Sequence, residues 1–255
     1  SHKNSNSQNY IIEYLLKYNL DIVLSGLANN DYNIKSIDNL DFPYNKLDSK
    51  TIQLLKILNK KKYDKKFYIK CDDDIFINLY NLYIFLQSHE KKFDLAGDMK
   101  HKNYICLQPF IKKRILKNNL DIWISGSFYI LSKKVIDNIE TIISNSIIKY
   151  KKKAKKFSAE DIMLSNILID NNYKLLSMDK SYHIPNFIVN NKREIIFNKS
   201  NIKLKYDFTN FQIKDIISVH LIKFNPDIFK YLIDLYEKEY QNIDILRIFE
   251  DRKIN

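Results

Sequence analysis

Apolar residues along the chain fall into two alternating patterns, short continuous runs and stretches with helical spacing. The runs predict strands at residues 21–27, within 33–40, and at 67–71, 93–96, 121–131, 173–178 and 215–223. The helical spacing predicts helices at residues 9–19, 48–62, 133–149, 158–168 and 227–239, and from residue 78 onward. Because strands and helices alternate through the first two thirds of the chain, we expect an α/β fold with three layers and a mostly parallel central sheet.

Three adjacent carboxylates, Asp72, Asp73 and Asp74, follow the strand predicted at 67–71. Neighbouring negative charges repel one another, and a divalent cation is their usual partner at neutral pH. Carboxylate oxygens are hard ligands that suit Mg²⁺ or Mn²⁺. The alternative is a solvated acidic turn after a strand, and the three residues alone leave both interpretations open.

A histidine occupies a comparable position late in the chain. His220 lies near the end of the strand predicted at 215–223, and ligands of α/β sheets bind at the carboxyl ends of strands. On its own, a strand histidine is more often a satisfied structural side chain than a metal ligand. The sequence therefore makes His220 a candidate ligand without deciding between the two roles.

The composition suits one sizeable core. The chain has 255 residues, of which 45% are hydrophobic, and its 3 Gly and 4 Pro argue against long flexible linkers. We therefore expect a single domain over residues 1–255, with residues 1–8 disordered.

The net charge of +12 favours phosphorylated or polyanionic partners, which include nucleotides, nucleic acid and anionic membrane surfaces. Two basic segments add to it. Residues 151–156 are usually read as a solvated loop, with nucleic-acid or membrane contact as the alternative. Residues 100–119 form either a solvated loop or a flap that faces substrate.

Neither cysteine usage nor hydropathy decides the compartment. Cys71 and Cys106 allow one disulfide but give no zinc-binding spacing. No apolar run reaches the roughly 18 to 20 residues that span a bilayer, and no signal peptide is recognisable. The chain begins with Ser1, so we expect a processed form or a fragment, and membrane association would require a segment outside this sequence.

Four blocks of the sequence, taken in order, resemble one enzyme family. Residues 68–78 carry an aromatic residue followed by Lys-x-Asp-Asp-Asp-Ile-Phe-Ile-Asn, similar to the metal-binding strand of β-1,3-galactosyltransferases and fringe-type glycosyltransferases. Residues 123–132 resemble that family's aromatic, Ser-Gly-Gly-x-Tyr-Val-Leu-Ser block, with Ser127 in place of the second glycine. Residues 160–162 resemble its Glu-Asp-Val block, and residues 219–222 its late Val-His segment. The four blocks together are specific, whereas an Asp-x-Asp alone would be weak.

The resemblance implies a GT-A fold with a nucleotide-binding half, an acceptor-binding half and a C-terminal helix, which we place at residues 9–98, 99–225 and 226–255. It further implies that a hexose or N-acetylhexosamine is transferred, with inversion, from a UDP-sugar to a hydroxyl of a glycan or protein. Mn²⁺, or Mg²⁺ in its place, would be the cofactor.

The same resemblance assigns roles to individual residues. Asp74 and His220 would ligate the metal together with Asp72, and Asp161 would be the general base, although a helix cap is its alternative role. Donor binding would involve Asp72, Asp73, Trp123, Ser125, Gly126 and Glu160. For Trp123, core packing is an equal alternative to stacking on the sugar.

Two other functions compete with glycosyl transfer. A catalytically inactive glycosyltransferase-like binding module is motivated by Ser127 and by an unrecognised first nucleotide-binding strand. A basic nucleic-acid-binding protein is motivated by the charge, but the chain lacks interleaved aromatic platforms, so we expect no nucleic-acid partner. The resemblance implies the secretory pathway or Golgi, while the few cysteines leave a cytoplasmic or viral-factory location open.

Overall fold

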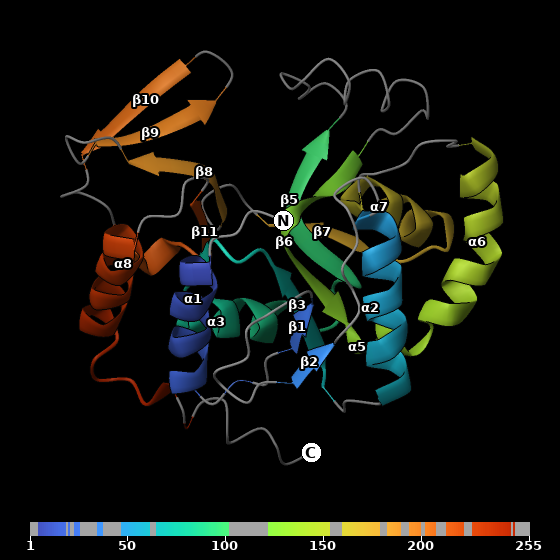
Figure 1. Cartoon of the computed structure of the whole chain (residues 1–255), viewed down its shortest axis with the longest axis horizontal. Coiled ribbons are helices and arrows are strands. Elements are labelled where there is room, and N and C mark those ends of the chain that lie inside the picture. The colour runs from blue at the N-terminus through green and yellow to red at the C-terminus, as the bar shows by residue number, and fades with distance from the viewer. Residues whose placement is uncertain are drawn as a thin grey trace. The chain divides into compact units, whose positions relative to one another are not determined.

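The protein is represented by a computed structural model (Figure 1). The structure describes residues 5–18, 20, 23–25, 35–37, 47–61, 65–101, 122–153, 160–178, 183–189, 194–199, 202–207, 213–221, 226–245 and 247. The segment expected to be a loop or flap, 100–119, lies almost wholly outside the described residues, as do Cys106 and residues 154–156 of the basic run. Residues 151–153 of that run, which we expected to be a loop, form the end of a helix.

The chain folds into two compact units that interleave along the sequence. The first unit contains residues 1, 23–71 and 91–178. The second unit contains residues 2–22, 72–90 and 179–255. The predicted assignment of residues 9–98 to nucleotide binding and 99–225 to acceptor binding stays a prediction.

The first unit is built on a four-stranded sheet in the order β3-β6-β5-β7. Its strands are β3 (Phe67–Cys71), β6 (Ile122–Ser132), β5 (Leu95–His101) and β7 (Leu175–Ser177). The long strand β6 pairs antiparallel with both β3 and β5, whereas β7 pairs parallel with β5. A separate parallel pair joins β1 (Val23–Ser25) to β2 (Lys35–Ile37).

Four helices share one hydrophobic cluster with this sheet. They are α2 (Leu47–Lys61), α5 (Lys133–Asp137), α6 (Ile139–Lys153) and α7 (Glu160–Asp170). From the sheet, Leu95, Ile124, Tyr129 and Leu131 enter the cluster, all at most 2% exposed. The single helix predicted at 133–149 is interrupted at Asn138, whose N–H bonds to Lys134 and Ile136 carbonyls and closes α5.

The second unit contains a five-stranded sheet in the order β10-β9-β8-β11-β4. Its strands are β10 (Ile202–Asp207), β9 (Glu194–Lys199), β8 (His183–Val189), β11 (Ser218–Leu221) and β4 (Ile75–Ile77). Its helical elements are α1 (Ser5–Lys17), α3 (Leu79–His89), α8 (Pro226–Glu239) and the 3₁₀ turn η4 (Ile213–Asp215). Helix α1 begins at Ser5, so part of the stretch 1–8 that we expected to be disordered is helical.

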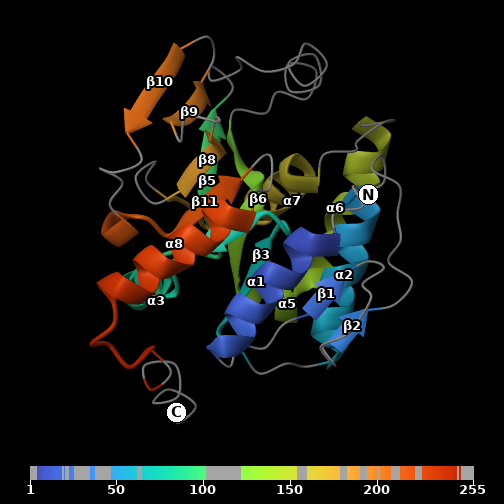
Figure 2. The ribbon, with the colours of Figure 1, turned by 60° about the vertical axis from the view of Figure 1, so that its left-hand side comes forward.

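Aromatic side chains form the core between α1, α8 and β4 in the second unit. Helices α1 and α8 lie side by side in Figures 1 and 2. The rings of Tyr14, Phe76, Phe229 and Tyr236 pack with centroids 5.7 to 6.3 Å apart, mostly edge to face. The Tyr14 hydroxyl donates a 2.7 Å hydrogen bond to the Ile77 carbonyl, which ties α1 to β4.

The α/β class is confirmed, but the expectation of a mostly parallel sheet is wrong for the described strands. Among their pairings only β1–β2, β5–β7 and β8–β11 are parallel. Strands β8, β9 and β10, which the sequence analysis did not predict, follow one another through short connections and therefore pair antiparallel. A parallel pair needs a crossover of about a dozen residues or more, and these connections are too short for one.

No helix within the described part of the chain is both long and apolar enough to cross a bilayer.

Candidate active site

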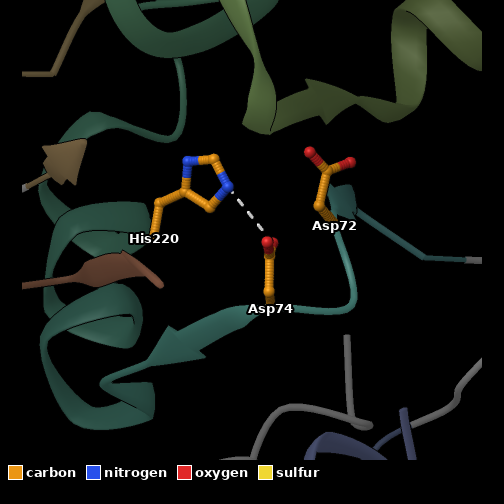
Figure 3. Close-up of side chains that lie close together, drawn as sticks. All are labelled: Asp72, Asp74 and His220. Carbon is orange, nitrogen blue, oxygen red and sulfur yellow. Dashed lines mark ion pairs between the residues drawn. The ribbon is translucent and has the colours of Figure 1, made fainter. Parts of the chain in front are cut away.

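The acidic triplet and His220 are brought together by one strand pairing in the second unit. Asp74 directly precedes β4, and β11 pairs antiparallel with β4 in a register that places His220 opposite Ile75. His220 Nε2 lies 3.2 Å from Asp74 Oδ1. Ligand atoms of Asp72, Asp74 and His220 all lie within 4.8 Å of one another (Figure 3).

A buried asparagine fixes the register of that pairing. Asn78 is fully buried, and its N–H donates a 2.7 Å hydrogen bond to the Ile217 carbonyl just before β11. Its side-chain oxygen accepts from the Asn81 N–H and caps α3, while its amide nitrogen donates to the Ile213 carbonyl at 2.9 Å. Because the strand end, the helix start and η4 are tied to one side chain, β4 has little freedom to slide against β11.

The cluster offers ligands that suit a divalent cation. Asp74 Oδ1 is buried and accepts no hydrogen bond from any described residue, although the His220 ring lies beside it. A buried carboxylate oxygen in that state is costly unless a cation or a charged donor satisfies it. Two carboxylates and one imidazole fit Mn²⁺ or Mg²⁺, so the residues present agree with the implied metal.

The three aspartates have different surroundings. Asp72 and Asp74 are partly buried and belong to the cluster, whereas Asp73 is exposed and does not. The sequence motif therefore supplies two candidate ligands on alternate positions of the turn. The predicted contribution of Asp73 to donor binding stays a prediction.

Asp161 lies in the first unit, in the first turn of α7, where its carboxylate accepts two backbone hydrogen bonds. The Ile162 N–H donates to Oδ1 at 2.8 Å, and the Gly126 N–H of β6 donates to Oδ2 at 3.1 Å. A Cβ atom at position 126 would lie 3.2 Å from the Asp161 Cβ, so the glycine permits this close approach of strand and helix.

Burial raises the pKa of the Asp161 carboxyl from its ordinary value of 3.8 to about 6. The neighbouring Glu160 carboxylate adds to the rise in pKa, and the two N–H donors and the Lys70 ammonium group oppose it. A carboxylate with a pKa close to neutrality can both hold and release a proton under physiological conditions. Helix capping and acid–base chemistry are both compatible with this placement.

Glu160 is 8% exposed and is held by residues from two other elements. The Thr51 hydroxyl of α2 donates to Oε2 at 2.5 Å, and Lys70 Nζ of β3 lies 3.3 Å from Oε1. Lys70 also donates a hydrogen bond to the Gly126 carbonyl. Oε2 thus accepts a hydrogen bond inside the first unit, while the buried Oε1 has the ion pair with Lys70 and accepts no hydrogen bond from any described residue. The predicted role of Glu160 in donor binding stays a prediction.

The remaining predicted donor-site residues lie on β6. Ser125 and Gly126 are partly buried, whereas Trp123 is 6% exposed, which favours packing over stacking on a ligand. At the neighbouring position the Ile124 N–H donates to the Ser165 hydroxyl of α7 at 2.9 Å. Strand β6 and helix α7 are therefore joined at both Gly126 and Ile124.

Comparison with protein families gives this geometry a context. A family model described as Galactosyltransferase matches residues 33–178, which is more than half of the chain. The chain belongs to the galactosyltransferase family. Asp72, Asp74 and Asp161 lie within the matched residues, while His220 lies beyond them, so its place in the cluster rests on the strand pairing alone.

Two solved structures that resemble this chain are themselves glycosyltransferases by name. A glycosyltransferase involved in the glycosylation of the major capsid of PBCV-1 is 12% identical, with a TM-score of 0.50, over 91% of this chain and 94% of that chain. The galactosyltransferase LgtC, solved with donor and acceptor sugar analogues, is 15% identical with a TM-score of 0.45, over 85% of this chain and 81% of that chain. A search of curated proteins found no match. The family match and the first of these structures confirm the GT-A fold, and this member of the galactosyltransferase family is a glycosyltransferase.

Sequence analysis missed several residues that organise the site. Lys70 and Asn78 both belong to the motif at 68–78 but received no role, because a single sequence does not reveal what a strand lysine or a terminal asparagine contacts. Thr51 and Ser165 lie inside helices without any distinguishing pattern. For Asn78, the N-cap position before an apolar helix was the available signal.

Proposed function

We propose that this galactosyltransferase-family protein moves a hexose or N-acetylhexosamine from a UDP-sugar to a hydroxyl of a glycan or protein, with inversion and with a divalent metal. The observation that carries the proposal is the cluster of Asp72, Asp74 and His220, in which a buried Asp74 oxygen has no hydrogen-bond donor. Mn²⁺ or Mg²⁺ bound by these residues would neutralise charge on the donor's diphosphate.

Asp161 would act as the general base. Each of its oxygens accepts one backbone N–H and retains a second lone pair for an acceptor hydroxyl. As the acceptor oxygen forms its bond to the anomeric carbon, the bond from that carbon to the diphosphate oxygen breaks. The electron pair leaves with UDP, and the acceptor proton passes to the Asp161 carboxylate.

The pKa of Asp161, about 6, suits this step, because the carboxylate is mostly ionised at pH 7 yet is more basic than an ordinary aspartate. The two N–H donors also fix the carboxylate in one orientation, which a general base requires.

The deciding experiment measures UDP release and sugar transfer from a panel of UDP-sugars, with Mn²⁺, with Mg²⁺ and with a chelator. We expect transfer from at least one donor to depend on metal.

Asp161→Asn should lower transfer by about 100-fold or more while UDP and Mn²⁺ still bind. Asp74→Ala should lose Mn²⁺-dependent UDP binding. Transfer that survives both substitutions would contradict the proposal, and Asp234→Asn on the exposed surface of α8 is the matched control.

A further inference from the structure

Lys70 occupies the centre of a closed set of contacts around Asp161 in the first unit. Its ammonium group donates to the Gly126 carbonyl and lies 3.3 Å from Glu160 Oε1. Gly126 in turn donates its own N–H to Asp161 Oδ2, and Glu160 is the residue next to Asp161 in α7. The contacts therefore return to Asp161 by two routes, one through the backbone of Gly126 and one through the Glu160 carboxylate.

We propose that Lys70 is a positioning residue for Asp161, holding the Gly126 peptide and the Glu160 carboxylate in the arrangement that orients the Asp161 side chain. This inference rests on the proposed function only for its catalytic consequence. It assigns a role to a residue that lies two positions before the acidic triplet and that the sequence analysis left without a function.

The surroundings hold the lysine in place from a third side. Lys70 Nζ lies 5.8 Å from the centroid of the Tyr129 ring, within the range of a cation–π contact. Its side chain is 24% exposed, and that of Glu160 is 11% exposed, so solvent screens this pair less than a surface ion pair. Thr51 donates to the other Glu160 oxygen, so the Glu160 carboxylate is held by contacts on both of its oxygens.

Gly126 couples the lysine to the carboxylate because its carbonyl accepts from Lys70 while its N–H donates to Asp161. A lysine that fixes the Gly126 carbonyl also restrains the backbone on the other side of the Gly126 Cα, where the Gly126 N–H donates to Asp161. The space between β6 and α7 is tight at this point, since the Asp161 Cβ, Cγ and Oδ2 all lie 3.2 to 3.4 Å from where a Gly126 Cβ would be. Loss of the lysine would therefore disturb the carboxylate through the Gly126 backbone.

The charges around Asp161 also affect the pKa of its carboxyl. Among described residues, the charged groups that act on the Asp161 carboxyl are Glu160 on its own helix and Lys70 on β3. Strand β6 contributes the Gly126 N–H, and the Thr51 hydroxyl of α2 donates to Glu160. The Lys70 charge favours the ionised form of Asp161, and the Glu160 charge opposes it. Removal of either group should therefore move the titration of Asp161, in opposite directions.

The test compares Lys70→Met, Glu160→Gln and the double variant with the wild type. The ¹³C NMR signal of the Asp161 carboxyl, assigned with Asp161→Asn, reports its titration without any need for catalysis. In Lys70→Met we expect the midpoint to rise by about one pH unit, and in Glu160→Gln to fall by a similar amount. The double variant, which leaves no unpaired buried charge, should titrate between the two.

Activity supplies the second measurement. The pH at which kcat/KM reaches half of its plateau should follow the NMR midpoint in each variant, and Lys70→Arg should restore most of the wild-type profile. Lys133→Met removes an exposed lysine, paired with Asp137 at 3.3 Å, and serves as the matched control with no change in either measurement.

The outcomes separate the inference from the proposed function. Midpoints that stay at the wild-type pH in both single variants would overturn the role of Lys70; should Lys70→Met fail to fold, Glu160→Gln and the double variant still decide it. If the midpoints move as expected but Asp161→Asn remains fully active, the network stands and the general-base proposal fails.

Discussion

His220 Nε2 lies 3.2 Å from Asp74 Oδ1 because β11 and β4 pair in a register that sets His220 opposite Ile75. The contact is an ion pair only when the imidazole is protonated, whereas a neutral imidazole is a metal ligand. The same two residues can therefore neutralise each other or share a cation, and the buried Asp74 oxygen without a hydrogen bond favours the second state.

Substitution of the two residues should test this directly. We expect Asp74→Ala and His220→Ala each to weaken Mn²⁺ binding on the order of 100-fold or more, since loss of a ligand costs at least as much as loss of its supporting partner. Calorimetric titration of the apoprotein with Mn²⁺ measures the effect. Asp234→Ala, on the exposed face of α8, should leave the affinity unchanged. Equal affinity in all four proteins would remove these residues from the metal site.

The activity should depend on pH through Asp161. A general base works only when it is deprotonated, so kcat/KM should rise with pH and level off above the pKa of Asp161, about 6. Initial rates between pH 5 and 8 at saturating metal measure this dependence. A rate that is flat across that range, or that falls as pH rises through 6, would contradict the assignment of Asp161 as the base.

The same pKa makes a prediction about stability. The folded protein holds a proton on Asp161 up to pH 6, while the unfolded chain releases it near pH 3.8, so folding binds protons between these values. The free energy of unfolding of the wild type should therefore fall as pH rises, compared with that of Asp161→Asn. We expect the difference between the two proteins to change by about 2 to 3 kcal/mol from pH 4 to pH 7. Urea denaturation of both proteins at several pH values gives the difference, and a difference that does not vary with pH would show that Asp161 titrates normally.

Much of the candidate site could be predicted from local sequence, and the missing parts have a physical cause. The strand at 67–71, the acidic turn and the helix that carries Asp161 are encoded by neighbouring residues, and each was predicted, the helix over 158–168. Strand β4 was not predicted, because three apolar residues between a turn and a helix carry no periodicity.

Contacts between distant segments were beyond the sequence for another reason. The pairing of Lys70 with Glu160, and the contact of Gly126 with Asp161, depend on how β3, β6 and α7 pack, which residue spacing does not report. In the second unit the antiparallel pairing was missed because β8, β9 and β10 lie in a stretch where the sequence analysis found no strand. In the first unit the strands at 67–71, 93–96 and 121–131 were predicted, but their residues do not report that β6 pairs antiparallel with β3 and β5.

Asn78 should be essential to the stability of the second unit. Asn78→Ala removes the N-cap of α3 and leaves the buried Ile213 carbonyl and the Tyr240 hydroxyl with fewer partners. We expect a loss of about 2 to 4 kcal/mol in the free energy of unfolding, measured with urea. Asn78→Ser keeps a capping oxygen and should recover only part of the loss. Asn138→Ala, at an exposed helix end, is the control and should cost little.

The two described glycines should respond differently to alanine, because different neighbours stand where their Cβ atoms would be. In Gly97→Ala the new carbon would lie 2.5 Å from Ile124 Cγ2 and 3.0 Å from the Phe128 carbonyl oxygen, at the register shift between β5 and β6. We expect about 1 to 3 kcal/mol of destabilisation from this overpacking. In Gly126→Ala the nearest atoms belong to the Asp161 side chain, at 3.2 to 3.4 Å, so that side chain must move.

Gly126→Ala should therefore lower kcat more than it lowers stability, and Gly97→Ala should do the reverse. Urea denaturation and initial-rate kinetics on both variants measure the contrast. Because Gly126 donates its N–H to Asp161, a displaced carboxylate would lose its orientation even while the rest of the first unit stays folded. Were Gly126→Ala to retain full activity with normal stability, the tight approach of β6 to α7 would have no bearing on the reaction, and Asp161 would be better explained as a helix-capping residue.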